Sequence, residues 1–295
     1  MNPKLNISEI IAEFPDLVMG IHGKPVYNLD SPFDVAVREN QLRAIQGRVD
    51  LGPQIPAHYL VYALGEAPTR EQSRIGGLPY RPRNLKWPHD ADGKPKEFIG
   101  QIDFSDSRTM LPQLPGDILL IFASEDGLDD NPFLLEWYPA GLTDLVCAGD
   151  LPKFEMTFPS VRENAHCYLY ETYDYPEATD RLRGTKYEAW KTLGLPCGGK
   201  IGGFQKTDTK TNIHICTVES VRLGTDDPFP FVNLKGWKAP SLRDWIDARM
   251  VEIVRKLSGL SARPRVFDVL MIGDLGRISV FHSGDGNFEV DCMSH

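Results

Sequence analysis

The sequence predicts an α+β fold, internally duplicated, with mostly antiparallel sheets and peripheral helices. Three observations predict it: many short segments with the apolar pattern of strands, a few capped amphipathic segments, and two copies of an Ile-Gly-Gly turn. The chain of 295 residues suits one large domain or two closely joined halves, and its 41% hydrophobic content allows a sizeable core.

Helices are predicted mainly at the edges of the chain. Ser31 and Pro32 are a suitable N-cap and first helical residue for a helix over 31–48, which follows a shorter one over 6–15. We therefore interpret residues 1–55 as a helical extension. Further helices are predicted over 178–194 and, with the strongest apolar stripe, over 241–259.

The remaining residues, 56–295, are predicted to form one domain of two related halves, about 60–160 and 185–295. Strands are expected where β-forming residues alternate or form short apolar runs. Residues 116–124 contain a short continuous apolar run bounded by glycine and acidic residues, which predicts a central strand buried on both faces. Phe98, Ile102 and Phe104 alternate on one face of the strand before it. The predicted strands are 58–64, 96–106, 116–124, 133–139, 165–177, 214–220, 266–274 and 276–283.

The two halves share an internal echo. SRIGGLPY at 73–80 resembles GKIGGFQK at 199–206, and each is followed by two strands and an acidic-glycine exit. We match 97–104 and 116–127 in the first half with 267–274 and 276–286 in the second. Three features in the same order favour a duplication over chance.

The paired glycines have two interpretations. Gly76, Gly77, Gly202 and Gly203 permit a backbone that side chains forbid, which favours tight structural corners entering a sheet. The alternative is a nest of backbone N–H groups that holds an anion. Its flanking cations and neighbours define the candidate ligand- or partner-binding residues, which are Arg74, Gln101, Lys200 and Arg277.

Several chemistries are not expected. The net charge of -9 argues against nucleic acid and anionic membranes, and is compatible with a basic protein partner. Phosphate-loop, dinucleotide and hydrolase motifs are missing from the sequence. His214 and Cys216 could share a strand face, but two ligands do not make a metal site. We predict no catalytic residues, metal or cofactor, although Cys197 in its glycine-rich turn is kept as a nucleophile candidate.

The N-terminus lacks the apolar segment of a signal peptide, and the cysteines are widely spaced, which predicts a cytoplasmic protein with free thiols. The motifs Ser73–Pro79, Trp87-Pro88, Gln101–Phe104, Lys200–Gly203 and Gly273–Arg277 resemble those of the YwqG-like family of bacterial domains of unknown function. This resemblance covers roughly residues 60–295. It departs at Phe204-Gln205-Lys206, where an aromatic-proline pair is more usual.

The resemblance implies an α+β fold with an internal duplication and brings no established reaction. Some members of that family occur beside polymorphic toxins, which implies a role in immunity or binding. The expected function is therefore a non-enzymatic binding protein that neutralises a basic toxin by direct contact. The alternatives are a small-ligand or anion-binding protein and an unrecognised enzyme.

Overall fold

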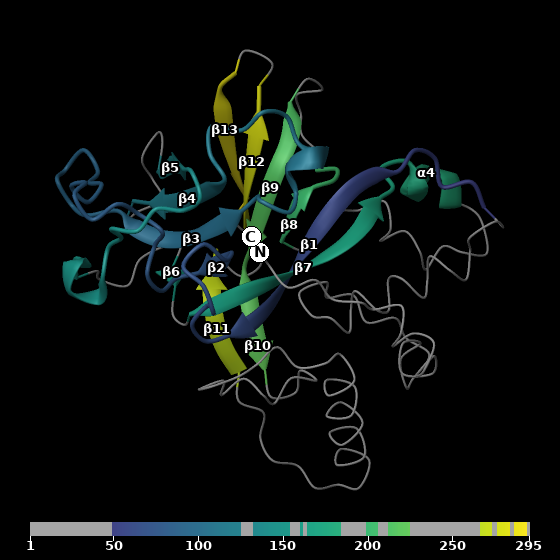
Figure 1. The fold of residues 1–295 in the computed structure, drawn as a ribbon. Helices are drawn as coiled ribbons and strands as arrows, with labels where there is room; N and C mark the ends of the chain where they lie inside the picture. Colours follow the sequence, from purple (N-terminus) through teal and green to yellow (C-terminus); the bar gives the residue numbers. More distant parts are fainter. Residues whose placement is uncertain are drawn as a thin grey trace, which may run out of the picture.

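The computed structural model describes residues 49–124, 132–153, 160–161, 164–183, 199–205, 212–224, 266–272, 276–283 and 286–293 (Figure 1). The helices expected over 6–15, 31–48 and 241–259 lie outside these residues, and so does Cys197. In the described part, no helix is both long and apolar enough to cross a membrane.

Strands dominate the described residues. Thirteen strands are present, against one α-helix of five residues, α4 (Ala178–Leu182), and two three-residue turns of 3-10 helix, η1 (Arg108–Met110) and η2 (Ala148–Asp150). The strands are β1 (Ile55–Leu64), β2 (Arg74–Ile75), β3 (Glu97–Asp103), β4 (Ile118–Ala123), β5 (Phe133–Tyr138), β6 (Ser160–Val161), β7 (Ala165–Asp174), β8 (Lys200–Gly202), β9 (Ile213–Glu219), β10 (Val221–Gly224), β11 (Val266–Met271), β12 (Arg277–His282) and β13 (Phe288–Met293).

The predicted α+β class is therefore wrong, because the structure is mostly β. The physical reason lies in how the sheet buries its apolar face. Its strands curve around a shared core and pack against one another, so a layer of helices is not needed to cover that face. All eight predicted strands are confirmed, with ends that differ by a few residues.

The main sheet has ten antiparallel strands in the order β13-β12-β9-β8-β1-β7-β2-β3-β4-β5. The long pair β1 and β7 forms its centre, and the order outward is the same on both sides. β2 and β8 occupy equivalent positions on the two sides, and so do β3 and β9, β4 and β12, and β5 and β13. A second sheet has the order β10-β11-β6. The strand order is thus symmetric about β1 and β7.

This symmetry corrects the matching of strands between the two halves that the sequence repeat suggests. The counterpart of β3 is β9, which pairs with β8 as β3 pairs with β2. The sequence match had assigned β11, but that strand belongs to the smaller sheet. The central strands are also exchanged between the two sides of the sheet. β1 precedes β2 in the chain but pairs with β8, and β7 precedes β8 but pairs with β2. The division into halves at 60–160 and 185–295 stays a prediction.

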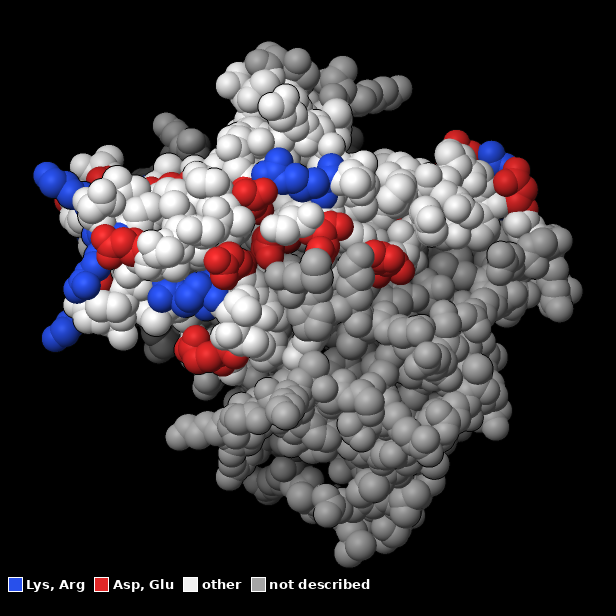
Figure 2. Space-filling view, viewed as in Figure 1, with Lys and Arg blue, Asp and Glu red and all other residues white. Residues whose placement is uncertain are grey.

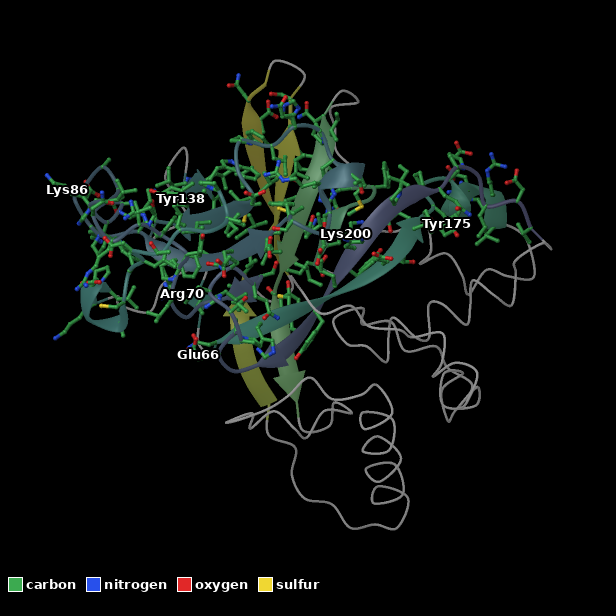
Figure 3. The ribbon with its side chains drawn as sticks, viewed as in Figure 1. Glu66, Arg70, Lys86, Tyr138, Tyr175 and Lys200 are labelled. Carbon is green, nitrogen blue, oxygen red and sulfur yellow. The ribbon has the colours of Figure 1, made fainter. Side chains whose placement is uncertain are left out.

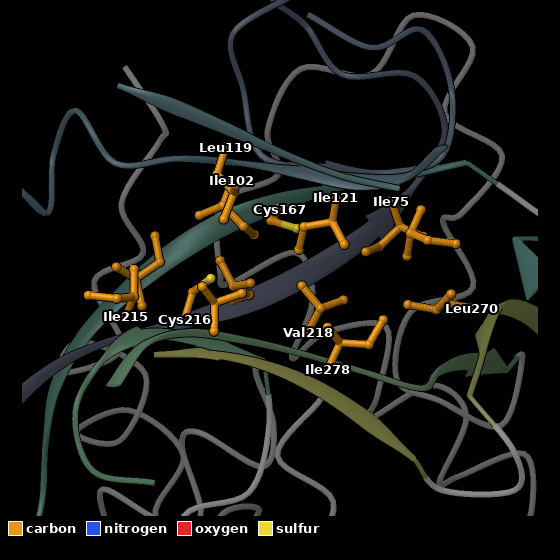
Figure 4. Close-up of a cluster of buried hydrophobic side chains, with 14 of the residues drawn as sticks. Ile75, Ile102, Leu119, Ile121, Cys167, Ile215, Cys216, Val218, Leu270 and Ile278 are labelled. Atoms are coloured by element: carbon orange, nitrogen blue, oxygen red, sulfur yellow. The ribbon is translucent and has the colours of Figure 1, made fainter. Parts of the chain in front are cut away.

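The main core lies inside the curved sheet, where side chains from strands far apart in sequence meet (Figure 4). Ile75, Ile121, Ile215 and Ile278 are among its fully buried members, and Leu270 joins them from the smaller sheet. Burying each such side chain contributes about 1.5–3 kcal/mol. The core therefore ties the two sheets together.

The outer face of β3 and β4 is buried as well. Tyr80, Phe98, Leu120 and Phe122 form a second cluster there, and Trp87 packs on Phe122 with ring centroids 5.6 Å apart. This confirms that the apolar run of β4 is buried on both faces. A register shift after Phe98 turns that side chain away from Ile102 and Phe104, so the predicted common face of β3 is wrong.

Candidate functional site

The two Ile-Gly-Gly segments form the same turn. Gly76 and Gly77 have φ of 64° and 72°, and Gly202 and Gly203 have φ of 64° and 70°. Both pairs therefore lie in the left-handed region, where a Cβ is unfavourable. Each turn follows a short strand beside the central pair, β2 against β7 and β8 against β1. The sequence expectation of tight corners agrees with this geometry.

Arg74, before the first turn, is buried and hydrogen-bonded to backbone carbonyls. Its Nε donates to Gln72 O at 3.2 Å, Nη1 donates to Leu78 O at 3.4 Å, and Nη2 donates to Thr69 O. Burial lowers the pKa of Arg74 to about 10, and the nearby charge of Arg70 acts in the same direction. The guanidinium thus closes its own turn.

Gln101 lies opposite Arg74 on β3 and is fully buried. Its Oε1 accepts the backbone N–H of Tyr80 at 2.8 Å, and its Nε2 donates to the carbonyls of Arg70 at 2.7 Å and Gln72 at 3.1 Å. The side chain joins the segments before and after the turn. Its amide groups are occupied by the fold, so we assign Gln101 a structural role.

Lys200, before the second turn, is completely buried. Its Nζ lies 2.6 Å from Asp174 Oδ2 and donates to Phe204 O, also at 2.6 Å. Phe204 follows Lys200 by four positions, as Leu78 follows Arg74, so the two cations close their turns alike. Asp174 also accepts Tyr59 OH at 2.7 Å and Phe204 N at 2.8 Å.

His214 extends the polar network around the second turn. Its Nδ1 lies 2.6 Å from Gly202 O, and its Nε2 lies 2.7 Å from Thr217 Oγ1, which contacts Ser279 Oγ at 3.0 Å. Burial, aided by the charge of Lys200, lowers the pKa of His214 to about 3. A neutral ring with its proton on Nδ1 fits these contacts, because a carbonyl can only accept.

His214 and Cys216, which could share a strand face, are not arranged as a pair of metal ligands. Both ring nitrogens of His214 have protein partners, while Cys216 lies in the apolar core, where burial raises the pKa of its thiol. No group of three metal-ligating side chains occurs in the residues that the structure describes.

Arg277 lies at the start of β12, beside the second turn. With the Gln205 amide oriented so that its oxygen faces Arg277, this oxygen lies 2.9 Å from Nη2 and 3.1 Å from Nε. Gln205 is buried, and it occupies the position where the first turn has Pro79. The glutamine that departs from the expected motif therefore holds Arg277.

The four predicted binding residues do not form one site. β1 and β7 separate β2 from β8, and Arg74 and Lys200 each donate to their own turns. Lys200 lies near the middle of the described body, whereas Arg70 and Glu66 lie away from it near the first turn (Figure 3). Only Lys200 and Arg277 belong to the same neighbourhood, through the second turn.

Sequence reasoning missed Asp174, the partner of Lys200, and Tyr59, whose hydroxyl donates to Asp174. Both lie within predicted strands, but nothing in the local sequence marks a pairing across 115 residues. The signal that could have found them is chemical. A lysine in an apolar strand next to a glycine turn needs a buried acceptor, and Asp174 ends the central strand just before a proline-containing turn.

Comparison with protein families finds one similarity. Residues 73–139 match the model of a domain of unknown function, DUF1963. The match begins at the first turn and runs through β2, β3 and β4 to the end of β5, and it excludes the second turn. A comparison with curated proteins gave no match.

Proposed function

We propose that this chain is a non-enzymatic protein-binding protein, and that its partner is a basic toxin which it neutralises by direct contact. The observation that carries this proposal is the burial of the candidate chemical groups. Arg74, Gln101, Lys200 and His214 direct their polar atoms at protein acceptors and donors, which leaves them as parts of the scaffold.

The anion-binding alternative is weakened by the same contacts. An anion nest needs N–H and cationic donors that point outward. The Arg74 guanidinium and the Lys200 ammonium donate to the carbonyls of Leu78 and Phe204, respectively, four residues further along each turn. The candidate nucleophile Cys197 lies outside the described residues, so the structure adds no support to the enzyme alternative.

Charge and family similarity support protein binding. The net charge of -9 favours a basic partner, because complementary charges speed association. On the face shown in Figure 2, acidic and basic residues are interspersed, so complementarity there would be local. The DUF1963 match and the YwqG-like motifs bring no reaction, and the toxin neighbours of the latter family motivate the immunity role.

The test uses the full chain as bait in its native host, followed by purification of any complex. We expect one basic protein to co-purify in a fixed ratio, and its toxicity in a growth assay to be suppressed by co-expression of this chain. The Arg74→Met variant, once urea unfolding shows that it is folded, is the matched control, and it should bind this protein as the wild type does. If a small anion such as inorganic phosphate binds instead, and Arg74→Met abolishes that binding, the proposal is wrong.

A further inference from the structure

The two ends of the main sheet differ in how they are covered. On β5, every residue of Phe133–Tyr138 is at least partly buried, and its charged member Glu136 pairs with Arg81 at 2.6 Å. At the other end, β12 and β13 form a hairpin that projects from the body (Figure 1). Among the described strands, β13 pairs with β12 alone.

Side chains alternate along β13. Phe288 and Val290 are partly buried and pack against the main core, whereas Glu289 and Asp291 are exposed on the opposite face. Phe288 also meets Trp137 of β5, with ring centroids 5.0 Å apart. Within the described residues, β13 therefore ends the sheet with an apolar face continuous with the core and an acidic face toward solvent.

The hairpin geometry shows which backbone groups are unpaired with β12. The Ser283 N–H donates to Asn287 O at 2.9 Å, which closes the hairpin. Hydrogen-bonded pairs recur at every second residue of an antiparallel ladder, so Glu289 and Asp291 bond to β12. The N–H and C=O groups of Phe288, Val290 and Cys292 consequently point away from the sheet.

We infer that β13 is the docking edge for an extended segment of a partner protein that carries basic residues on one face and apolar residues on the other. This inference rests on the proposed protein-binding function and names its surface. The backbone groups of the segment pair with those of Phe288, Val290 and Cys292. Its basic side chains lie beside Glu289 and Asp291, and its apolar side chains pack near Phe288.

Protection against aggregation is the competing explanation, since charged residues on an edge strand discourage pairing with other chains. The two explanations predict different results with a basic strand. A purely protective edge binds neither a basic nor an acidic segment, whereas a docking edge selects the basic one.

The test uses the full chain and a synthetic ten-residue peptide that alternates lysine and valine, with a glutamate–valine peptide as its control. We expect the lysine peptide to bind in calorimetry and to slow hydrogen exchange at Phe288, Val290 and Cys292. The acidic peptide should not bind. Absence of binding by the lysine peptide, or exchange protection elsewhere than β13, overturns the inference.

Variants locate the contact. Glu289→Lys/Asp291→Lys should weaken binding of the lysine peptide at least about tenfold, as expected for the loss of two charge contacts. Asp92→Lys/Asp144→Lys changes the net charge equally at exposed sites in other loops and should leave binding unchanged. Equal weakening by both pairs would mean that only overall charge matters, which contradicts the inference.

A backbone variant separates pairing from charge. Val290→Pro removes an N–H that points outward and spares the ladder with β12, so the chain should stay folded while peptide binding is lost. Val290→Thr is the matched control and should bind. If a native partner still binds the charge-reversed chain, β13 is not the docking edge, but the proposed protein-binding function stands. If the lysine peptide binds at β13 but no native partner is found, the docking edge stands and the proposed function fails.

Discussion

The two Ile-Gly-Gly turns share a backbone conformation but hold their buried cations with different partners. Both have the same left-handed backbone, and in both a buried cation bonds to the carbonyl four residues on. Arg74 is held by three carbonyls, and no carboxylate lies within ion-pair distance among the described residues. Lys200 is held by the carboxylate of Asp174.

The difference follows from the shapes of the two cations. A guanidinium has five N–H groups spread in a plane and can reach several carbonyls, whereas an ammonium is a compact charge that one carboxylate neutralises well. The second turn therefore depends on a carboxylate from another strand, and the first depends on local backbone. This comparison predicts that the second turn is the more vulnerable of the two.

The largest expected effect comes from removing that partner. Asp174→Ala leaves the Lys200 ammonium buried without its carboxylate, and should cost about 3–5 kcal/mol of unfolding free energy. At the first turn, Glu66 is exposed and contacts Asn164, so Glu66→Ala should cost less than about 1 kcal/mol. Urea unfolding measures both.

The double variant Asp174→Ala/Lys200→Met is the control for Asp174→Ala. It removes the buried charge together with its partner, so it should recover a large part of the lost stability. If Asp174→Ala is no worse than Glu66→Ala, the two turns are equally robust and the comparison fails.

The next effect concerns the glycines. A Cβ at Gly203 would lie 2.3 Å from Asp174 Oδ2 and 2.9 Å from Ala57 Cβ, whereas one at Gly77 would lie 3.2 Å from the exposed Glu66 carboxylate. Both replacements place alanine at positive φ, which costs about 1–2 kcal/mol. Gly203→Ala should cost at least about 1 kcal/mol more, because Asp174 is fixed by three donors.

Thermal or urea unfolding of Gly77→Ala and Gly203→Ala, side by side, measures this difference. Gly93→Ala is a suitable reference, because Gly93 also has positive φ and a Cβ there meets nothing within 4 Å. Equal losses at all three positions would show that only the backbone conformation matters.

The last effect is a pH dependence at the second turn, which accumulates over several pH units. His214 has a pKa lowered to about 3 in the folded state, so below about pH 6.5 the unfolded chain binds a proton that the folded chain does not. The stability that His214 contributes above pH 6.5 is therefore lost on acidification, by about 1.4 kcal/mol per pH unit down to about pH 3.

The measurement compares wild type with His214→Gln between pH 7 and pH 4. The stability advantage of the wild type should shrink as the pH falls. His166, near the first turn, has a pKa lowered by burial and by Arg74, so it acts in the same direction. An advantage that stays constant with pH would contradict the assignment of a neutral buried His214.

Much of the local structure could be predicted because its signals are local. Apolar alternation located the strands, and paired glycines located both turns, since positive φ is a property of the residue itself. The continuous apolar run of β4 also predicted burial on both faces. The same reasoning predicted Arg74, Gln101 and Lys200 as binding residues. Their burial could not be predicted, because a sequence does not show which side chains are buried.

The class and the site were decided by tertiary contacts. The sheet curves around its own core, which makes the structure mostly β, and it exchanges β1 and β7 between the two sides. A register shift of one residue turned Phe98 outward. The sequence by itself determined where the chain extends and where it turns. Only the folded structure decided that Asp174 meets Lys200, because that contact depends on strands brought together by burial rather than by proximity in the chain.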